Sequence, residues 1–342
     1  MINLISSQPN IRYYSGFTGS VGILIGSGST YLLIVDGRYT AQAKEEVIKG
    51  TKVIEAPIGI NIWEPAINFL KKKKISRLGY EEDKIDVATF NKIKAALPGV
   101  EFYSISKEIR GKRIIKHASE IELIAKAALI ADLTFDCMIH IIKPGMTELE
   151  VSAHIDYLMK IFKSENPAFE TLVSSGKLSA YPHGKPTDKK ILKGDIVVMD
   201  FGARYKGYNS DITRMVSLAA PDKKRLKIFN AVLKAQEAAI SIVRDGVSAS
   251  VVDSAARGVL AREKLGRYFT HGTGHGIGLQ VHEAPRVSLK SEDILKEGMV
   301  MTVEPGVYIP GIGGFRIEDM VLVERSGCRV LTRSPKSLKV IT

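Results

Sequence analysis

The stretch from Met199 to Arg214 constrains the fold of this chain more strongly than any other. It reads MDFGARYKGYNSDITR and places two acidic residues, Asp200 and Asp211, on either side of Tyr205–Gly207, with apolar runs beyond them. Apolar runs separated by a short segment that contains glycine predict a β-hairpin. With the turn at Tyr205–Gly207, the two carboxylates would face each other across the strands, with Cβ atoms roughly 4.5–5.5 Å apart. Like charges at that distance repel, so a buried pair must share a proton or bind a cation.

The same arrangement occurs a second time further along the chain. In VEPGVYIPGIGGFRIED, Glu304 and Glu318 lie symmetrically about Gly311, which predicts a second hairpin with two facing acids. The four acids could also be ordinary charges on exposed hairpins. However, aspartate is depleted in strands and the neighbouring residues are apolar, so a bound cation is the more economical interpretation.

Three histidines fall within one glycine-rich window, THGTGHGIGLQVHEAPR: His271, His275 and His282. Glycines surround His275 at alternate positions, and glycine in a strand commonly marks the close approach of a ligand or of a second chain segment. A fourth histidine, His183 in AYPHGKP, precedes the first hairpin. The remaining histidines lie in a connector or in helical patterns and are interpreted as ordinary residues: His117, His140 and His154.

Four carboxylates and one imidazole form an oxygen-rich set of ligands, which suits Mn²⁺, Co²⁺, Fe²⁺ or Zn²⁺. Carboxylates can bridge, so two such ions about 3.5–4 Å apart, with a hydroxide between them, are plausible. A metal that prefers thiolate ligands is not favoured, because neither Cys137 nor Cys328 lies in a metal-binding spacing.

The length of 342 residues predicts two domains. Residues 20–106 alternate short apolar runs with amphipathic ones, which predicts a small α/β domain, and a polar connector follows over 106–116. From residue 119, two similar halves follow, each with two helical patterns, then strands, then one acid-bearing hairpin. The expected fold class is therefore α+β, with a smaller α/β N-terminal domain (1–108), a pseudo-symmetric C-terminal domain (109–342), and the site at the junction of its halves.

Local signals mark the helices of these halves. Two capping boxes are expected at the starts of the first pair of helices, Ser119 with Glu122 and Thr147 with Glu150. The tracts IKPGMT and VRDGVS occupy matching places between the two helices of each half.

Composition narrows the functional classes. The chain has 49 basic and 37 acidic residues, a net charge of +12, but the basic residues are scattered without interleaved aromatic residues, so nucleic-acid binding is not expected. No apolar run reaches the length of a membrane span, so no membrane partner is expected. The two cysteines do not suggest a disulfide framework, which favours a reducing, cytoplasmic location.

As a set, four motifs resemble those of the Xaa-Pro peptidases, the prolidases and aminopeptidases P of the pita-bread metallopeptidase fold: VVMDFGARYKGYNSDITR, HGTGHGIGLQVHEAPR, VEPGVYIPGIGGFRIED and AYPHGKPTDKK. The resemblance covers residues 109–341. Residues 5–105 resemble, more weakly, the creatinase-type N-terminal domain, through SSQPNIRYYSGFTGS and DGRYTAQA. Because the chain begins close to these motifs, the helix and first strand that usually open such a domain are expected to be mostly absent.

The resemblance implies a site with two divalent metal ions, Mn²⁺ or Co²⁺ first, with Zn²⁺ or Fe²⁺ also possible ions. It implies that Asp200 is a terminal ligand of one ion and that Asp211 bridges the two. It further implies that His275 and Glu304 bind the second ion and that Glu318 bridges both.

The implied reaction is hydrolysis of the bond that precedes proline in a dipeptide or short peptide. A hydroxide between the ions attacks the carbonyl, and Glu304 acts as general base or proton shuttle. His282 stabilises the developing oxyanion or assists the departing proline nitrogen. His183 and His271 resemble residues that line the pocket on the proline side.

Two arginines are candidates for fixing the carbonyl or carboxylate of the substrate, Arg286 and Arg316, since the guanidinium fork matches a carboxylate. The choice between a dipeptidase and an aminopeptidase P is open, because it depends on whether the pocket closes after the proline. The resemblance also suggests a homodimer.

Related proteins offer alternatives. Methionine aminopeptidases share the fold and the ligand types, but the RIED and HEAPR segments resemble the proline-specific branch. Creatine-cleaving relatives use the fold without metal, and non-catalytic binding modules have lost ligands. All five ligand positions are filled here, which argues against both.

Overall fold

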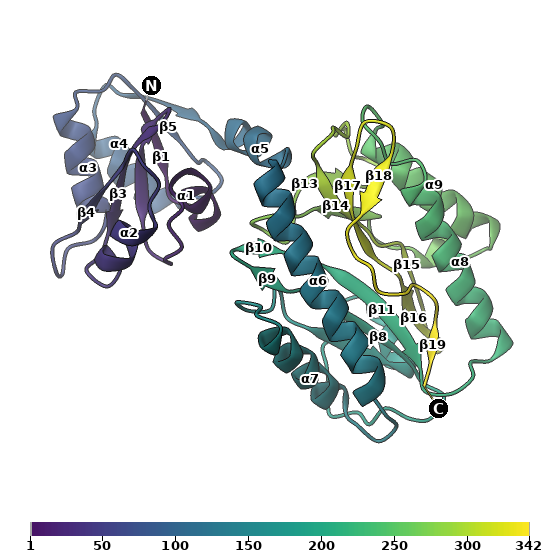
Figure 1. The fold of residues 1–342 in the computed structure, drawn as a ribbon. Coiled ribbons are helices and arrows are strands. Elements are labelled where there is room, and N and C mark those ends of the chain that lie inside the picture. Colours follow the sequence, from purple (N-terminus) through teal and green to yellow (C-terminus); the bar gives the residue numbers. More distant parts are fainter. Residues whose placement is uncertain (1, 342) are drawn as a thin grey trace. The chain divides into compact units, whose positions relative to one another are not determined.

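A computed structural model of the chain describes residues 2–341 and separates into two compact units, Met1–Arg113 and Ile114–Thr342 (Figure 1). The segment 106–116, expected to be a polar connector, is mostly helical, as α5 (Ser106–Ile114). The sequence did not predict this helix, because only Ile109 and Arg113 are buried in it. The segment therefore has almost no periodic pattern of apolar residues. The domain boundary expected between 108 and 109 stays a prediction.

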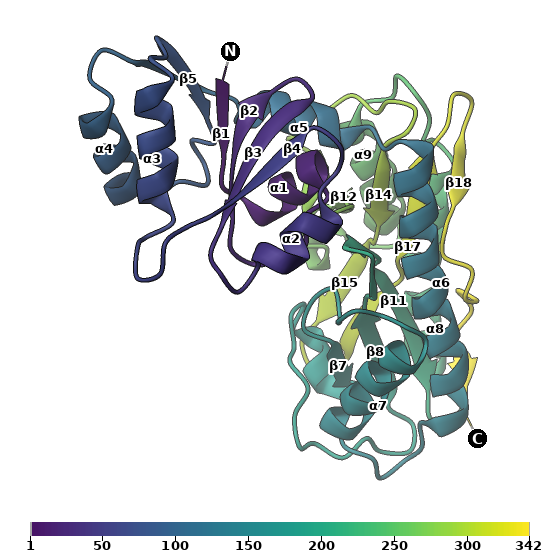
Figure 2. The same cartoon turned by 60° about the vertical axis from the view of Figure 1, so that its left-hand side comes forward.

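The N-terminal unit is a six-stranded mixed sheet with helices on both faces (Figure 2). The strand order is β4-β3-β2-β1-β5-β6, with β1 antiparallel to β2 and parallel to β5. The strands are β1 (Ile2–Ile5), β2 (Ile23–Ser27), β3 (Thr30–Val35), β4 (Thr51–Glu55), β5 (Arg77–Tyr80) and β6 (Glu101–Ser104). The helices, besides α5, are α1 (Gln8–Ser15), α2 (Thr40–Glu46), α3 (Trp63–Lys72) and α4 (Val87–Ala96).

Strand β3 explains the continuous apolar runs of this unit. Leu32 and Ile34 pack into a core that α3 and α4 cover, whereas Leu33 and Val35 pack into a second core with α1 and α2. A strand that is buried on both faces needs apolar residues at every position. The predicted small α/β domain is confirmed.

The expected absence of the first strand was wrong, because β1 is present before the SSQPNIRYYSGFTGS motif; α1 lies within that motif. The buried carboxylate of Glu81 accepts the backbone N–H groups of Ser6 and Ser7 at 2.6 and 2.9 Å, which holds the start of α1. The strand was missed because it is only four residues long and has no preceding pattern to mark its start.

The C-terminal unit contains four long helices and two main sheets, with strand orders β19-β11-β8-β7 and β13-β12-β14-β17-β18. The helices are α6 (Ala118–Ile141), α7 (Glu148–Ile161), α8 (Lys223–Ile240) and α9 (Ala249–Arg262), with short 3₁₀ turns η1 (Gly176–Ala180) and η2 (Gly266–Tyr268). The strands of the first half are β7 (Leu172–Ser175), β8 (Ile196–Phe201), β9 (Arg204–Tyr205), β10 (Tyr208–Asn209) and β11 (Ile212–Ser217). The remaining strands are β12 (Gly274–Gly276), β13 (Glu283–Val287), β14 (Val300–Val303), β15 (Gly306–Ile309), β16 (Gly313–Arg316), β17 (Asp319–Val323), β18 (Cys328–Val330) and β19 (Lys339–Val340).

The two halves of this unit repeat one plan, as the sequence predicted. Helices α6 and α7 precede the strands β7 to β11, and α8 and α9 precede the strands β12 to β17 (Figure 1). Along β8, Val197 and Met199 pack toward α6 and α7, whereas Ile196 and Val198 belong to the core that α8 and α9 cover. The alternation of side chains along β8 therefore joins the cores of the two halves.

The first acid-bearing hairpin forms, but the predicted register was wrong by two residues. Its turn consists of Lys206 and Gly207, both with positive φ (45° and 79°), as in the two-residue turns that suit hairpins. Asp200 consequently lies opposite Thr213, and Asp211 is a diagonal neighbour on the same face. The two acids do not face each other directly.

The second hairpin has the predicted register. Gly306 pairs with Arg316 and Val303 pairs with Asp319, so the strands on both sides of the turn are symmetric about Gly311. The positions of the two predicted acids follow β14 and precede β17, where regular pairing ends.

One of the two expected capping boxes is present. Thr147 Oγ1 accepts the N–H of Glu150 at 3.0 Å, and the Glu150 carboxylate accepts the N–H of Thr147 at 2.6 Å. The box expected at Ser119 was wrong, because α6 begins earlier and Glu120 accepts the N–H of His117 at 2.9 Å.

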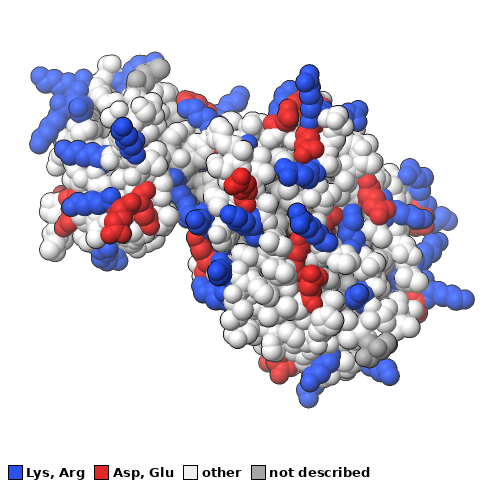
Figure 3. Space-filling view, in the orientation of Figure 1, with Lys and Arg blue, Asp and Glu red and all other residues white. Residues whose placement is uncertain are grey.

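The surface and the helices bear on possible partners. On the face of the C-terminal unit seen in Figure 3, basic side chains are scattered and acidic ones lie between them. Within residues 2–341, none of the helices combines the length and the apolar character that a membrane crossing requires.

Candidate metal centre

Three side chains from three separate segments converge in the C-terminal unit: Asp211, His275 and Glu318. Each offers one ligand atom, and these atoms lie within 4.8 Å of one another. Asp211 stands between β10 and β11, His275 is in β12, and Glu318 stands between β16 and β17. The two acids are buried, with 5% and 1% of their surface exposed, and His275 is half-buried. The spacing is that of groups that can share one cation.

Glu304 lies beside the same imidazole. The Nε2 atom of His275 is 3.4 Å from Glu304 Oε1 and 3.6 Å from Asp211 Oδ2. The backbone N–H of Glu304 donates to Thr273 O at 2.7 Å, and its carboxylate accepts from the Thr302 hydroxyl at 3.2 Å. These two hydrogen bonds fix the position of the Glu304 carboxylate just after strand β14.

The protonation of His275 follows from its partners. Its Nδ1 lies 3.0 Å from Gly276 O, which can only accept, so Nδ1 carries the proton. Nε2 is then unprotonated, and its lone pair faces carboxylate oxygens. A cation between them would be attracted to both. A backbone carbonyl that holds the far nitrogen is the usual support of a metal-binding histidine.

Asp200 completes the group through an ion pair with Arg316. One oxygen, Oδ2, accepts a short hydrogen bond from Arg316 Nη2. The same guanidinium donates to Thr213 Oγ1 at 3.0 Å, to Tyr308 Oη at 2.6 Å and to Pro182 O at 3.1 Å. These contacts orient Asp200. They also use most of the N–H groups of Arg316, which was predicted to bind the substrate, and that role of Arg316 stays a prediction.

Three carboxylate oxygens at the centre are buried without a hydrogen-bond partner among residues 2–341: Asp200 Oδ1, Asp211 Oδ1 and Glu318 Oε1. Burying an acceptor without a partner is costly, and burying an unpaired charge is more so. All three belong to predicted ligands. Oxygen donors plus one imidazole fit a divalent ion of hard to borderline character, so the residues present fit the group that was inferred.

The pKa values of the acids and of His275 also fit a site that binds a cation. Burial, followed by the neighbouring acids, raises the pKa of Asp211 and that of Glu318 well above their usual values. Burial also raises the pKa of Glu304 to about 7. Burial lowers the pKa of His275. Without a cation, Asp211 and Glu318 therefore favour the protonated form and His275 favours the neutral form.

The other predicted histidines lie around this centre in different settings. The ring of His282 is 4.3 Å from that of His275 between centroids, and its side chain is exposed. His271 is held by Gly272 O at 2.7 Å and by Tyr308 Oη at 2.9 Å. Burial lowers the pKa of His271 to about 4, so it is neutral at pH 7.

Two predicted residues lie on exposed parts of neighbouring segments. His183 is exposed in the segment between η1 and β8, in a turn closed by the N–H of Gly184 and the carbonyl of Tyr181 at 3.0 Å. Arg286 lies on β13 opposite His275, with its side chain exposed.

The glycines around His275 have the close contacts that the sequence suggested. A Cβ atom at Gly274 would lie 2.1 Å from Thr302 O, and one at Gly276 would lie 1.9 Å from Ala284 O. Side chains at these positions would push the neighbouring strands apart, so the glycines keep β12 within reach of the acids.

The sequence reasoning missed Thr213 and Tyr308. Thr213 donates to Glu318 Oε2 at 2.7 Å and accepts from Arg316, and Tyr308 links His271 to Arg316. The correct register of the first hairpin would have revealed Thr213, because it lies directly opposite Asp200. No local signal marks Tyr308.

Comparison with known proteins gives the family. The chain matches metallopeptidase family M24 over residues 122–325 and the creatinase/prolidase N-terminal domain over residues 2–115. The chain belongs to metallopeptidase family M24. This metallopeptidase is 41% identical over 338 residues to the Xaa-Pro dipeptidase of Pyrococcus horikoshii, covering 98% of this chain and 93% of that protein.

Solved structures agree over the whole length of the metallopeptidase. The X-Pro aminopeptidase from Thermotoga maritima matches with a TM-score of 0.93 and 39% identity, over 99% of this chain and 97% of that one. The Xaa-Pro dipeptidase from Bacillus anthracis matches with a TM-score of 0.94 and 38% identity, over 99% and 94%. The expected fold class is confirmed: a creatinase-type N-terminal domain followed by a pita-bread domain. The protein is a metal-dependent hydrolase.

Proposed function

We propose that this metallopeptidase hydrolyses the peptide bond that precedes proline, in dipeptides or at the N-terminus of short peptides. The observation that carries the proposal is the grouping of Asp211, His275 and Glu318, whose ligand atoms lie within 4.8 Å of one another, with one buried and unpaired oxygen on each of the two acids. The names of the similar proteins supply the substrate class, since they include both Xaa-Pro dipeptidases and an X-Pro aminopeptidase.

We propose five ligands for two divalent ions, with Mn²⁺ or Co²⁺ first and Zn²⁺ or Fe²⁺ as further options: Asp200, Asp211, His275, Glu304 and Glu318. When bound, the ions supply Lewis-acid polarisation of the scissile carbonyl and lower the pKa of an attacking water. The orphaned oxygens support Asp200, Asp211 and Glu318, and the contact with the imidazole supports Glu304.

Glu304 handles the proton of the attacking water. Without metal, burial raises the pKa of this carboxyl to about 7, which supports a role in proton transfer. It can take a proton during attack and return it to the proline nitrogen, which leaves as a secondary amine and must be protonated.

The histidines bind and polarise the substrate around this step. His282, exposed beside His275, can donate a ring N–H to the developing oxyanion or to the departing nitrogen. Tyr308 accepts from Arg316 and donates to Nε2 of His271, and the ring of His271, which burial keeps neutral, is proposed to line the pocket. His183 and Arg286, both exposed, are proposed to contact the proline side and the substrate carboxylate.

Purified protein, stripped with chelator and reloaded with Mn²⁺ or Co²⁺, tests the proposal. We expect about two ions per chain and cleavage of Ala-Pro, of Ala-Pro-Ala, or of both, and the ratio of the two turnovers separates dipeptidase from aminopeptidase P. Glu318→Gln should abolish cleavage and reduce metal content without unfolding the protein. No cleavage of either peptide by the loaded protein would end the proposal.

We further propose that the protein works in the cytoplasm as a homodimer. The two cysteines are free and lie outside any disulfide, as suits a reducing compartment. Sedimentation of the purified protein measures its oligomeric state directly.

A further inference from the structure

A single buried carboxylate, that of Glu148, ties together both ends of the segment that carries His183. Glu148 is the first residue of α7 and is fully buried. Its Oε1 accepts the N–H and the hydroxyl of Ser175 at 2.8 and 2.7 Å. Its Oε2 accepts the N–H and the hydroxyl of Thr187 at 3.2 and 2.7 Å. Residues 176–186, the His183 loop, are therefore closed at their base by four hydrogen bonds to one side chain.

A buried carboxylate needs compensation, and the surroundings of Glu148 provide it. All four donors point at its two oxygens, and the N-terminus of a helix stabilises a negative charge. Lys189 adds a positive charge one bond away, because its Nζ donates to Ser175 Oγ at 2.6 Å and to Asp195 Oδ2 at 2.8 Å. The arrangement is specific to an anion at this position, since an amide would place a donor against other donors.

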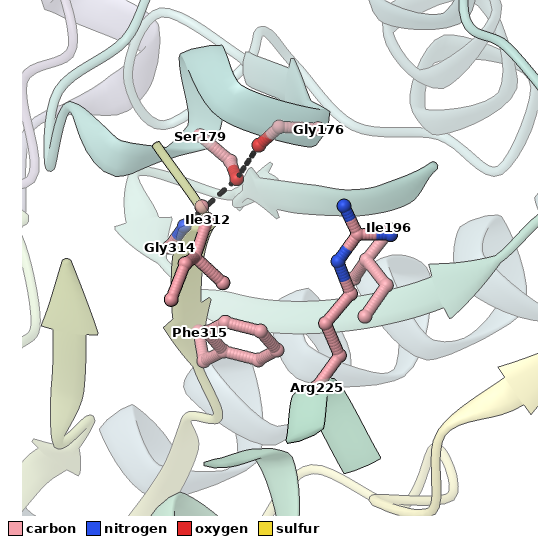
Figure 4. Close-up of a pocket in the computed structure, with 8 residues that line it drawn as sticks. Gly176, Ser179, Ile196, Arg225, Ile312, Gly314 and Phe315 are labelled. Atoms are coloured by element: carbon pink, nitrogen blue, oxygen red, sulfur yellow. Dashed lines mark hydrogen bonds between the residues drawn. The ribbon is translucent and has the colours of Figure 1, made fainter. Parts of the chain in front are cut away.

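The middle of the His183 loop is fixed to β16, as Figure 4 shows. Ser179 Oγ donates to Gly176 O at 2.6 Å and accepts the N–H of Gly314 at 2.8 Å. The two backbones touch, because a Cβ atom at Gly314 would lie 2.0 Å from Ser179 O. Further along, Pro182 O accepts from Arg316, the partner of Asp200. The loop is thus held at its base and along one side, and His183 projects from the held part.

We propose that Glu148 is a positioning residue that sets the place of His183, and through it the fit of the proline side of the substrate. The inference rests on the proposed function, because it takes His183 as a substrate contact. His183 itself is exposed, and the turn from Tyr181 to Gly184 presents it, so the position of its ring is determined by the loop. Without the tie at the base, the loop would keep its contacts with β16, the ion pair of Lys185 with Glu170 at 2.7 Å, and the backbone hydrogen bond from Leu149 to Thr187 O at 3.2 Å.

Glu148→Gln, with Glu150→Gln as the matched control, tests this inference. Glu150 lies on the same helix and is exposed, and its carboxylate caps the helix without touching the loop. We expect Glu148→Gln to lower kcat/KM for the Xaa-Pro substrate about tenfold, mainly through KM, with the metal content unchanged. The control should keep the wild-type kinetics. In a His183→Ala background, Glu148→Gln should cause no further loss.

A second readout is independent of activity. Lys177 is exposed within η1, so trypsin should cut the Lys177–Leu178 bond several-fold faster in Glu148→Gln than in the wild type or in Glu150→Gln. If Glu148→Gln does not fold, Thr187→Val removes one of the four bonds at the edge of the network and should show the same changes at smaller size. Mass spectrometry identifies the cut.

The outcomes separate the inference from the proposed function. A wild-type protein that cleaves no Xaa-Pro bond, with faster trypsin cutting in Glu148→Gln, would refute the function and leave the loop anchor in place. Active wild type with equal losses from Glu148→Gln in the presence and absence of His183 would refute the positioning role. So would a loss of metal in Glu148→Gln, or equal trypsin rates in all variants.

Discussion

Replacing Asp211 by asparagine should change the stability of the metal-free and the metal-loaded protein in opposite directions. The side chain is buried, and its Oδ1 has no hydrogen-bond partner in the part of the chain that the structure describes. Burial first, and then Glu318, Asp200 and Glu304, raise the pKa of Asp211 well above its usual value. Asparagine keeps the shape of the side chain and removes the titratable charge. The substitution should therefore stabilise the metal-free protein. In the metal-loaded protein it removes a proposed ligand and should lower the stability.

Proton linkage sets the sign for the metal-free protein. Between the usual pKa of aspartate and the raised pKa of Asp211, the folded protein holds a proton that the unfolded chain has released. The unfolding free energy therefore falls by about 1.4 kcal/mol for each unit of rising pH in that interval. Asp211→Asn cannot titrate at this position, so its unfolding free energy does not fall in this way. For a domain of this size, we expect the metal-free variant to melt roughly 3–6 °C higher at pH 7 for each such unit.

With metal bound, we expect the wild type to be more stable than Asp211→Asn. At a concentration of 100 times Kd, the ion adds about 2.7 kcal/mol to the stability of a protein that binds it only when folded. A variant that lacks the proposed ligand Asp211 should gain much less. Calorimetric melting of chelated and Mn²⁺-loaded protein at pH 5 and pH 7 measures both effects.

Asp132→Asn is the control, since Asp132 is equally buried but accepts the N–H groups of Arg333 and Ser334 at 2.8 Å each. It should lower the melting temperature of both forms. The reasoning fails if Asp211→Asn behaves like this control without metal, or if Mn²⁺ stabilises Asp211→Asn as much as the wild type.

Three further predictions concern the surroundings of the centre. His282→Ala should lower turnover far more than it lowers metal content, measured by steady-state kinetics and metal analysis; equal losses would make His282 a support of the ligands. Gly276→Ala places a Cβ atom 1.9 Å from Ala284 O and should cost about 1–3 kcal/mol or more in denaturant unfolding, with weaker metal binding; a variant as stable as wild type would contradict the close strand contact. Because the pKa of His271 is about 4 when folded and ordinary when unfolded, acidification from pH 7 to pH 4 should destabilise the metal-free protein by about 3 kcal/mol more than it destabilises His271→Gln. Parallel stability curves for wild type and His271→Gln would show that burial does not hold this ring neutral.

Much of the candidate site could be inferred from local patterns. The symmetry of Glu304 and Glu318 about Gly311 predicted the register of the second hairpin, because a turn with glycine at its centre fixes the pairing of the strands beside it. The glycines beside His275 predicted a close approach of backbone, which the contacts with Thr302 and Ala284 bear out. The capping box of Thr147 and Glu150 also depends only on neighbours along the chain.

Where the local signal was ambiguous, the prediction failed. The first hairpin turns at two residues because Lys206 adopts a positive φ, a conformation that lysine rarely takes and that composition does not reveal. The polar helix α5 buries only Ile109 and Arg113 among its described residues, and β1 is only four residues long, so neither produces a periodic pattern. Their conformations follow from packing against the rest of the N-terminal unit.

The sequence by itself determined which groups could bind a cation, since four acids beside two predicted turns and an imidazole in a glycine-rich strand have few other uses inside a protein. Only the tertiary structure decided how their charges are balanced. Arg316 reaches Asp200 across 116 residues of chain, and Thr213 reaches Glu318 across 105. Hairpin spacing is a local property of the backbone, whereas the partner of a buried charge depends on which distant segments the hydrophobic cores bring together.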